Sequence, residues 1–393
     1  MIKDKNMICF APADWRWYGS CKRLMSIFSH HNKILYINHI SISTPSIKET
    51  GTKVFIKRLL RKLKTLSRPF RKENENLYSY SPLIFPGYHG VIKKWNQLLL
   101  RFQIQFLQKI LHLSNPVVWI ENPVGITVAK NVNPELILYY RTDKFESYRE
   151  LRDRQDILSL EEKLTHDAAI ILCVSSKLYE EKLRFRKKNV YYIPHGVDFT
   201  HFNNAIKDPF VPEEIKHIRH PVVGYFGSLS NSNDEALIHY CATERPEISF
   251  VLIGTVLGEF KLIRDLPNVY FLGYKNYTVL PDYAKNFDVC IMFWKVTEWI
   301  EHCNPVKTME YLAMGKPVVS VAIDDICKNF KGIISIAKNC EEFLAKIEEE
   351  LGNDSPEKQK KRIAFVENET WEARAEVISR VMEKNWRRAV TNR

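Results

Sequence analysis

A lysine and a glutamate three residues apart, Lys307 and Glu310, lie in the stretch NPVKTMEYLAMGKPVV, which has the pattern of a short helix. Asn304 is a preferred N-cap residue, Pro305 is favoured at the first helical position, and Gly315 ends the pattern. A helix N-terminus favours a phosphate, and Lys307 adds a full positive charge there. A carboxylate one turn further on suits the two hydroxyls of a ribose. The spacing therefore predicts a nucleoside-diphosphate site, although a surface ion pair has the same spacing.

Gly227, Gly254 and Gly273 each follow directly on a short apolar run that reads as a buried strand. Glycine lets the backbone turn sharply or lets a ligand come near. In open parallel sheets, ligands bind just outside the carboxyl ends of the strands. We therefore expect these glycines to line a binding site, with three ordinary turns as the alternative.

Short β-rich runs alternate with segments of helical periodicity along almost the whole chain, which indicates an α/β fold with parallel sheets covered on both faces. The predicted strands are Met7–Phe10, Ile34–Ile37, Leu77–Tyr80, Val117–Ile120, Leu136–Tyr140, Ala169–Val174, Val190–Ile193, Val222–Phe226, Phe250–Ile253, Val269–Leu272, Asp288–Trp294 and Val318–Ile323. The predicted helices include Lys22–Ser29, Val54–Leu66, Val91–His112, Asp153–His166, Ser176–Phe185 and Trp371–Trp386.

A chain of 393 residues is longer than one hydrophobic core usually organises, so two domains are expected. Residues 194–221 combine turn residues with little apolar periodicity, which is typical of a domain boundary. We predict an N-terminal Rossmann-like domain over 1–198, a C-terminal Rossmann-like domain over 199–370, and a helix over 371–393 that crosses back to the first domain. A cleft is expected between the two domains.

The composition excludes several classes of protein. With 45% hydrophobic and 12% aromatic residues, the chain is neither disordered nor fibrous. No apolar stretch approaches the length needed to span a bilayer, and the polar start does not resemble a signal peptide. The eight cysteines match no zinc or disulfide framework, so we expect reduced thiols in a cytoplasm.

Positive charge is concentrated in the first half of the chain. Residues 1–200 hold 33 Lys+Arg against 18 Asp+Glu, whereas the remainder holds 25 against 28. Nine of the basic residues lie in Lys53–Lys72, which has no acidic residue and has leucines among its charges. Such a composition predicts an interfacial helix on an anionic membrane, with a solvated basic helix or loop as the alternative. The expected location is the cytoplasm, peripheral on the inner face of the cell membrane.

The stretch NPVKTMEYLAMGKPVV closely resembles the nucleotide-sugar motif of GT-B fold glycosyltransferases, especially bacterial members near glycosyltransferase family 4 that build polysaccharides. VVGYFGSL, FVLIGT and NVYFLGYKNYTVLPDYAKNFDVCIMFW follow the C-terminal domain of that family in order. CVSSKLYEEKL and YYIPHGVDFTHF resemble the end of its N-terminal domain. The resemblance covers residues 165–325 well and the first 160 residues only loosely. It implies the GT-B fold and sugar transfer from a nucleotide-diphosphate-sugar, with UDP-sugars favoured.

The resemblance also implies which residues bind the donor. Glu310 would hold the ribose, Lys307 would face the diphosphate or the sugar, and backbone contacts near residues 273–280 would frame the base. The predicted donor-binding residues are Gly227, Ser228, Gly254, Gly273, Tyr274, Leu280, Asn304, Pro305, Val306, Lys307 and Glu310. No metal and no other cofactor are expected. The implied acceptor is a lipid-linked compound or a saccharide in the biosynthesis of a bacterial surface polysaccharide or glycolipid.

One departure from the family pattern bears on the mechanism. Family 4 members usually carry a glutamate eight positions before the one corresponding to Glu310, and here that position is His302. In that family an Arg/Lys pair often follows the first strand of the C-terminal domain, and here the sequence SLSNSNDE stands in its place. Both changes point toward inverting relatives such as glucuronosyltransferases, which need a general base. Asp143, after a predicted strand, is the preferred base, with an N-cap of the following helix as the alternative, and Asp14 is the second candidate. His302 is expected to have a structural role or to contact the sugar.

Other functions are compatible with parts of the sequence. A GT-B fold nucleotide-sugar epimerase or a catalytically inactive GT-B scaffold is one alternative, and the missing glutamate leaves the inactive scaffold open. A nucleic-acid-binding protein would fit the pI near 9.1, but no recognition motif accompanies the charge. A dinucleotide-dependent oxidoreductase would need a GxGxxG after a strand, and the chain has none. The expected partners are a nucleotide-sugar, its acceptor and an anionic membrane surface, but not nucleic acid.

Overall fold

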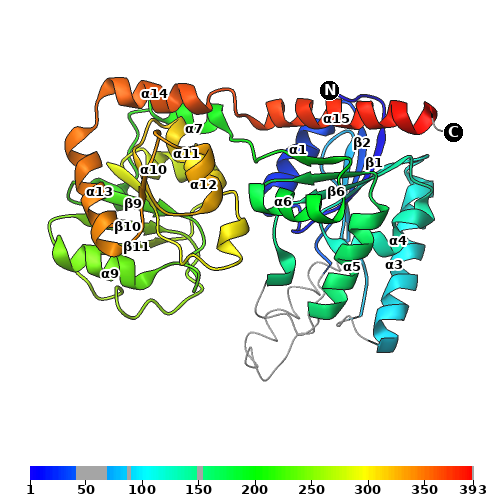
Figure 1. Ribbon diagram of the computed structural model, residues 1–393, viewed down its shortest axis with the longest axis horizontal. Coiled ribbons are helices and arrows are strands. Elements are labelled where there is room, and N and C mark those ends of the chain that lie inside the picture. The colour runs from blue at the N-terminus through cyan, green and yellow to red at the C-terminus, as the bar shows by residue number, and fades with distance from the viewer. Residues whose placement is uncertain (41–68, 86–89, 148–153, 392–393) are drawn as a thin grey trace. The chain divides into compact units, whose positions relative to one another are not determined.

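The computed structural model describes residues 1–40, 69–85, 90–147 and 154–391 (Figure 1). They form two compact units, of which unit 1 comprises Met1–Ile193 with Ala375–Arg393 and unit 2 comprises Pro194–Arg374. The boundaries predicted from the sequence lie after residues 198 and 370. Each unit contains one mostly parallel sheet with helices packed around it, which confirms the predicted α/β fold class.

Unit 1 is built on an eight-stranded sheet in the order β3-β4-β2-β1-β5-β6-β7-β8. Among the described strands, only β3 and β4 pair antiparallel, and the other neighbours are parallel. The strands are β1 (Asn6–Phe10), β2 (Lys33–Ile37), β3 (Phe70–Lys72), β4 (Leu77–Tyr80), β5 (Val117–Ile120), β6 (Leu136–Arg141), β7 (Ile170–Cys173) and β8 (Val190–Tyr192). Every residue of β5, β6 and β7 is buried, which explains why these strands read as unbroken runs rather than as alternating ones.

Among its described residues, unit 1 has the helices α1 (Ser20–Phe28), α3 (Gly90–Ile110), α4 (Ile126–Ala129), α5 (Arg154–Asp167), α6 (Ser176–Phe185) and most of α15 (Trp371–Thr391). Short 3₁₀ turns lie at η1 (Pro123–Gly125), η2 (Lys130–Val132) and η3 (Phe145–Ser147). The predicted apolar stripe of α15 is buried at Trp371, Ala375, Ile378 and Met382. The backbone N–H of Ile2 donates to Ser379 Oγ at 3.1 Å, so the last helix is held against the first residues of the chain.

Unit 2 has a six-stranded, fully parallel sheet in the order β11-β10-β9-β12-β13-β14. The strands are β9 (Val222–Phe226), β10 (Ser249–Ile253), β11 (Val269–Gly273), β12 (Val289–Met292), β13 (Val318–Val321) and β14 (Ser335–Ala337). The helices are α7 (Phe199–Ala205), α8 (Glu213–Lys216), α9 (Glu235–Glu244), α10 (Leu280–Ala284), α11 (Val306–Ala313), α12 (Asp324–Asn329), α13 (Cys340–Asn353) and α14 (Pro356–Val366), with 3₁₀ turns η4 (Tyr277–Val279) and η5 (Ile300–His302). One apolar cluster fills the space between sheet and helices.

The basic segment Lys53–Lys72 is described only at its end. Phe70–Lys72 form the exposed edge strand β3, which pairs antiparallel with β4, so a helix does not extend through these three residues. Pairing with the neighbouring strand, rather than local helix propensity, sets their conformation. Residues 53–68, and with them the predicted helix Val54–Leu66, lie outside the described residues.

Candidate functional site

The ends of β9 and β10 are each followed by a glycine with a positive φ angle. Gly227 has φ +142°, and a Cβ atom there would lie 2.2 Å from Lys307 Cε and 3.0 Å from Tyr225 Oη. Gly254 has φ +153°, and its Cβ would lie only 1.8 Å from the carbonyl oxygen of Gly227. Only glycine fits at both positions, because the two loops approach backbone to backbone and a lysine lies across them.

Lys307, in the first turn of α11, lies at the carboxyl end of the sheet of unit 2. Its Nζ atom is 5.2 Å from the ring centre of Trp294 and 5.8 Å from that of Tyr225. Trp294 Nε1 in turn donates to Tyr225 Oη at 3.2 Å. None of the described carboxylates forms an ion pair with this ammonium, so the alternative of a Lys307–Glu310 ion pair is not realised. Aromatic faces therefore hold a cation whose charge is available to an anion.

The prediction that Asn304 caps α11 is wrong. The N-cap position is Pro305, and no side chain caps the helix. Asn304 is instead buried, where its Nδ2 donates to Asp325 Oδ2 at 2.9 Å and its Oδ1 accepts from the His195 backbone N–H at 3.2 Å. These tertiary partners take the groups that a local cap would use. The start of α11 thus carries no acidic or capping side chain that would compete with a bound anion.

Glu310, one turn further along α11, is held at the carboxyl end of β11. It is buried, and its Oε1 accepts a hydrogen bond from Tyr277 Oη at 2.9 Å. Tyr277 is the first residue of η4, four residues after the end of β11, and its ring stacks on His201 with centroids 5.1 Å apart. Gly273 ends β11 with φ +67°, and nothing lies within 4 Å of the position where its Cβ would be. The hydrogen bond from Tyr277 thus fixes the direction of the Glu310 carboxylate. The strand that precedes Tyr277 ends at Gly273, where there is open space beside the backbone.

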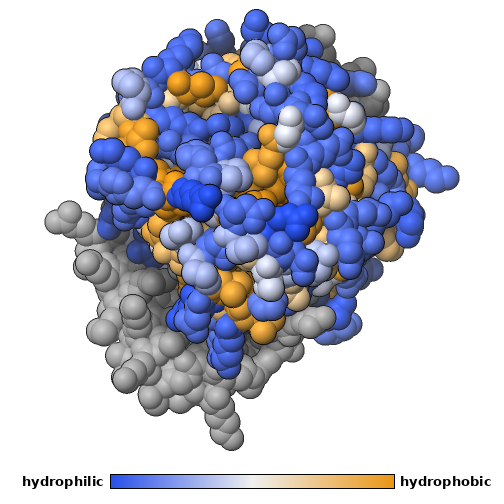
Figure 2. All heavy atoms as spheres, turned by 90° about the vertical axis from the view of Figure 1, so that its left-hand side faces the viewer, coloured by the Kyte–Doolittle hydropathy of each residue, from blue (hydrophilic) through white to orange (hydrophobic). Residues whose placement is uncertain are grey.

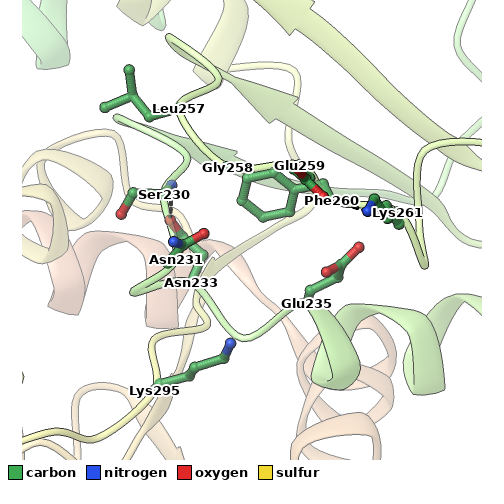
Figure 3. A pocket seen from close by; sticks show the side chains of 10 residues that line it. All are labelled: Ser230, Asn231, Asn233, Glu235, Leu257, Gly258, Glu259, Phe260, Lys261 and Lys295. Atoms are coloured by element: carbon green, nitrogen blue, oxygen red, sulfur yellow. Dashed lines mark hydrogen bonds and ion pairs between the residues drawn. The ribbon is translucent and has the colours of Figure 1, made fainter. Parts of the chain in front are cut away.

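A polar pocket of about 530 Å³ opens at the carboxyl ends of β9, β10 and β12 (Figure 3). It is lined by Ser230, Asn231, Asn233, Glu235, Leu257, Gly258, Glu259, Phe260, Lys261 and Lys295. These residues come from three separate loops and the start of α9, so no local motif marks the pocket in the sequence. Its position agrees with the rule that ligands bind outside the carboxyl ends of parallel strands.

Two hydrogen-bond donors of this pocket have no partner among the described residues. Asn233 is buried, and its Oδ1 accepts from the Ser230 backbone N–H at 2.9 Å, which leaves its Nδ2 unsatisfied. Lys295 is exposed and pairs with no acidic side chain in the described part of the chain, whereas Lys261 pairs with Glu259 at 2.6 Å. A buried amide donor without a partner is costly, and a ligand oxygen would satisfy it. The backbones of Asn233 and Trp294 form an isolated antiparallel β-bridge, so the pocket adjoins the residues around Lys307.

The other predicted donor-binding residues are distributed along the same edge of unit 2. Ser228 is exposed directly after Gly227, Tyr274 is 61% exposed directly after β11, and Leu280 begins α10 half-buried. Val306 is half-buried at the start of α11. The structure therefore brings the predicted residues together at the ends of consecutive strands and at the tip of one helix. Their contact with a donor stays a prediction.

His302 lies in η5 within unit 2. The ring is buried, and its Nδ1 lies 2.6 Å from the backbone carbonyl oxygen of Glu298. This contact fixes the orientation of the imidazole. Its predicted contact with the sugar stays a prediction.

The two candidate bases lie at the carboxyl edge of the sheet of unit 1. Asp143 is half-buried in a bend two residues after β6, and its Oδ1 accepts from the Lys144 backbone N–H at 2.9 Å. Asp14 follows β1 and pairs with Arg16 at 3.0 Å. In the sheet, β1 and β6 are separated only by β5, so both aspartates occupy the same edge.

A buried ionic network anchors the bend that carries the preferred base. Arg141 is 2% exposed and donates to Glu146 and to Glu161, each at 2.7 Å. Lys144, on the other side of the bend, donates to Glu181 at 2.6 Å. Burial alone would lower the pKa of the Arg141 guanidinium, but Tyr139 and the surrounding carboxylates raise it overall. The flanking residues of the bend are therefore fixed by charged hydrogen bonds that water cannot easily replace.

Glu121, which directly follows β5, was not predicted from the sequence. Its carboxyl is fully buried and accepts from Trp119 Nε1 at 3.2 Å and from Thr142 Oγ1 at 3.4 Å. Burial raises the pKa of Glu121 to about 7. Because Thr142 precedes Asp143, this carboxyl neighbours the preferred base. The signal that selected Asp143, an acidic residue just after a strand, would also have selected Glu121.

Replacing Glu121 by Gln should stabilise the protein at pH 8 and have little effect at pH 5. The folded protein holds the Glu121 proton up to a pKa of about 7, against 4.5 ordinarily. The stability that this carboxyl contributes is thus fully present below about pH 4.5 and is lost as the pH rises through 7. At pH 8, the buried charge of Glu121 therefore lowers the free energy of unfolding by about 3 kcal/mol. Denaturant unfolding of the parent and of Glu121→Gln at both pH values measures this change in the free energy of unfolding. Glu135→Gln, which changes an exposed carboxylate, is the control. An equal change at pH 5 and pH 8 would contradict the titration of Glu121.

Comparison with solved structures places the two units in a known fold. Anabaena HepE, solved in complex with UDP and glucose, is similar with a TM-score of 0.66 and 14% identity, over 96% of this chain and 99% of that chain. Sucrose-phosphate synthase from Thermosynechococcus elongatus is similar with a TM-score of 0.68 and 13% identity, over 97% and 99%. At these identities the likeness shows the fold alone. The fold is GT-B, with two Rossmann-like units, as predicted from the sequence.

Sequence comparison gives the class of the second unit. Residues 220–353 match the family described as "Glycosyl transferases group 1". TuaH of Bacillus subtilis (strain 168), whose name assigns it to teichuronic acid biosynthesis as a glycosyltransferase, is 27% identical over 219 residues, which are 53% of this chain and 54% of TuaH. The chain thus spans about half the length of this curated relative. The resemblance to GT-B glycosyltransferases is confirmed, and the match to the glycosyltransferase group 1 family lies within unit 2.

Proposed function

We propose that the protein is a glycosyltransferase that moves a sugar from a nucleotide-diphosphate-sugar, preferentially a UDP-sugar, to a lipid-linked or saccharide acceptor. The observation that carries the proposal is the placement of Lys307 and Glu310 at the carboxyl edge of unit 2. Lys307 is a cation that pairs with none of the described carboxylates, and Glu310 is a buried carboxylate oriented by Tyr277. The family match over residues 220–353 includes both residues and supports the same reading.

In the proposed donor complex, the nucleotide extends along the strand ends of unit 2. The diphosphate lies at the uncapped start of α11, beside Lys307 and Gly227. The ribose hydroxyls donate to Glu310, and the base contacts the backbone after β11, near Gly273. A positive charge and helix dipole that face the diphosphate stabilise the negative charge that develops when the bond to the sugar breaks. The adjoining polar pocket then receives the sugar, whose hydroxyls satisfy Asn233 Nδ2.

In the proposed reaction, a carboxylate of unit 1 removes the proton from the acceptor hydroxyl. Asp143 is the preferred base because it follows β6 at the carboxyl edge and because its bend is anchored on both sides. Asp14 is the second candidate, and His302 is proposed to contact the sugar. With one base and no protein nucleophile, the sugar would be transferred with inversion. The nucleotide-sugar enters as substrate, and we propose no resident metal or cofactor.

The proposed acceptor belongs to the biosynthesis of a bacterial surface polysaccharide or glycolipid. The name of TuaH, which refers to teichuronic acid, supports this choice. Such acceptors are carried on lipids at the inner face of the cell membrane, where we propose that the protein works as a peripheral enzyme. The basic character of the first 200 residues supports that placement.

A thermal-shift screen of the full chain against UDP-, GDP-, ADP- and dTDP-sugars tests the donor. A ligand at 100 times its Kd adds about 2.7 kcal/mol to the free energy of unfolding, so a UDP-sugar should raise the melting temperature clearly. The Lys307→Ala variant should show little or none of this shift. No stabilisation by any nucleotide-sugar would reject the proposal. Stabilisation without turnover of a radiolabelled donor across a panel of acceptors would indicate a binding scaffold instead.

A further inference from the structure

Helix α3 of unit 1 is apolar on two opposite faces. Its inner face buries Leu100, Ile104 and Leu107 against the unit. Its outer face is defined here as the six exposed apolar residues Val91, Trp95, Leu98, Phe102, Phe106 and Ile110, each at least 54% exposed. Their spacing of three or four residues places them in one stripe along the whole helix.

This outer face differs from an ordinary protein surface. Single exposed apolar side chains are common, but a continuous stripe of six marks an interaction site. Figure 2 shows a different face of the molecule, on the side of α9 and α13, for comparison. There the apolar side chains are scattered among hydrophilic ones. On α3, the rings of Phe102 and Phe106 stack with centroids 6.5 Å apart and so form a single aromatic surface. A helix with two apolar faces needs a second apolar environment.

The charges on α3 indicate what that environment is. The helix carries four basic residues and no acidic one. Lys93 pairs with Asp156, but Lys94, Arg101 and Lys109 are exposed beside the stripe, and none of them has an ion-pair partner among the described residues. An apolar stripe flanked by cations is complementary to a bilayer with anionic headgroups, because the cations reach the phosphates while the rings enter the acyl boundary.

The length and polarity of α3 fix how it would meet a bilayer. It has 21 residues, but within the described part of the chain no helix is apolar enough to cross a membrane. Its inner face is also already packed against unit 1. The helix must therefore lie along a membrane surface rather than across it.

We propose that the outer face of α3 docks unit 1 on an anionic lipid bilayer. The aromatic and aliphatic side chains of the stripe enter the boundary between headgroups and acyl chains, and Lys94, Arg101 and Lys109 contact lipid phosphates. None of these residues belongs to the basic segment Lys53–Lys72. The proposal names a surface for the proposed peripheral location and does not depend on the proposed sugar transfer.

Vesicle sedimentation of the full chain tests the proposal without any nucleotide. The parent should bind vesicles of equal parts phosphatidylcholine and phosphatidylglycerol at least about tenfold better than vesicles of phosphatidylcholine alone. The double variant Phe102→Ser/Phe106→Ser should lose at least about tenfold in binding to the mixed vesicles. Phe185→Ser, which changes an 80% exposed phenylalanine of α6 in the same unit, should bind like the parent. Arg101→Gln/Lys109→Gln should weaken binding to the anionic vesicles only.

Three outcomes would overturn the proposal, provided that circular dichroism shows each variant folded. The parent could fail to prefer anionic vesicles. The phenylalanine variant could bind them like the parent, which would assign the membrane contact to residues 41–68 or to another surface. Light scattering could show that the parent is a dimer and the phenylalanine variant a monomer, which would make the outer face of α3 an interface between two copies of the chain.

Discussion

Replacing Glu310 by Ala should lower the affinity for UDP about 10- to 100-fold and abolish the preference for UDP over 2′-deoxy-UDP. The Glu310 carboxylate is buried and oriented by Tyr277, so ribose hydroxyls would form charge-assisted hydrogen bonds with it. Such bonds contribute about 1.5–3 kcal/mol, and about 1.4 kcal/mol corresponds to a factor of ten. Titration calorimetry of the parent and the variant with both nucleotides measures the affinities and the preference.

Two further variants sharpen this experiment. Tyr277→Phe removes the hydrogen bond that orients the carboxylate and should cause an intermediate loss. Glu341→Ala removes an exposed carboxylate from the first turn of α13 and should leave both affinities unchanged. If Glu310→Ala still prefers UDP over 2′-deoxy-UDP as the parent does, Glu310 does not bind the ribose.

Replacing Asp143 by Asn should lower kcat at least about 100-fold while leaving the affinity for the donor unchanged, because general-base catalysis typically contributes a factor of 10² or more. Asparagine has nearly the same shape and can still accept from the Lys144 backbone N–H, but it cannot take up a proton. The rate is measured with a radiolabelled donor, and calorimetry with UDP shows whether the donor site is intact.

Asp14→Asn is the matched comparison, since Asp14 lies at the same edge of the same sheet. It should retain most of the activity if Asp143 is the base. Retention of more than about a tenth of the rate by Asp143→Asn would exclude it from that role. A large loss in Asp14→Asn alone would assign the base to Asp14.

The parallel strands could be predicted because they are buried on both faces. β9 was predicted with its exact bounds, since all five of its residues are buried and a glycine follows. In contrast, β3 has three exposed residues, and β14 has three residues of which two are only half-buried. These short edge strands have no apolar signal of their own. Their conformation depends on pairing with β4 and β13, which local sequence does not reveal.

The site was predictable where its residues share one element. Lys307 and Glu310 lie on one helix, and their spacing alone suggested a joint role. The role of Asn304 could not be found in this way, because Asp325 and His195 are distant in sequence. Lys295 and Asn233 were missed for the same reason, since the pocket is assembled from the loops of three strands.

A crystal structure of the full chain with bound UDP tests the proposed donor site most directly. We predict that the ribose hydroxyls lie within hydrogen-bond distance of the Glu310 carboxylate and that a phosphate oxygen contacts Lys307 Nζ above Gly227. UDP bound elsewhere, with Lys307 and Glu310 both out of contact with it, would contradict the proposed site.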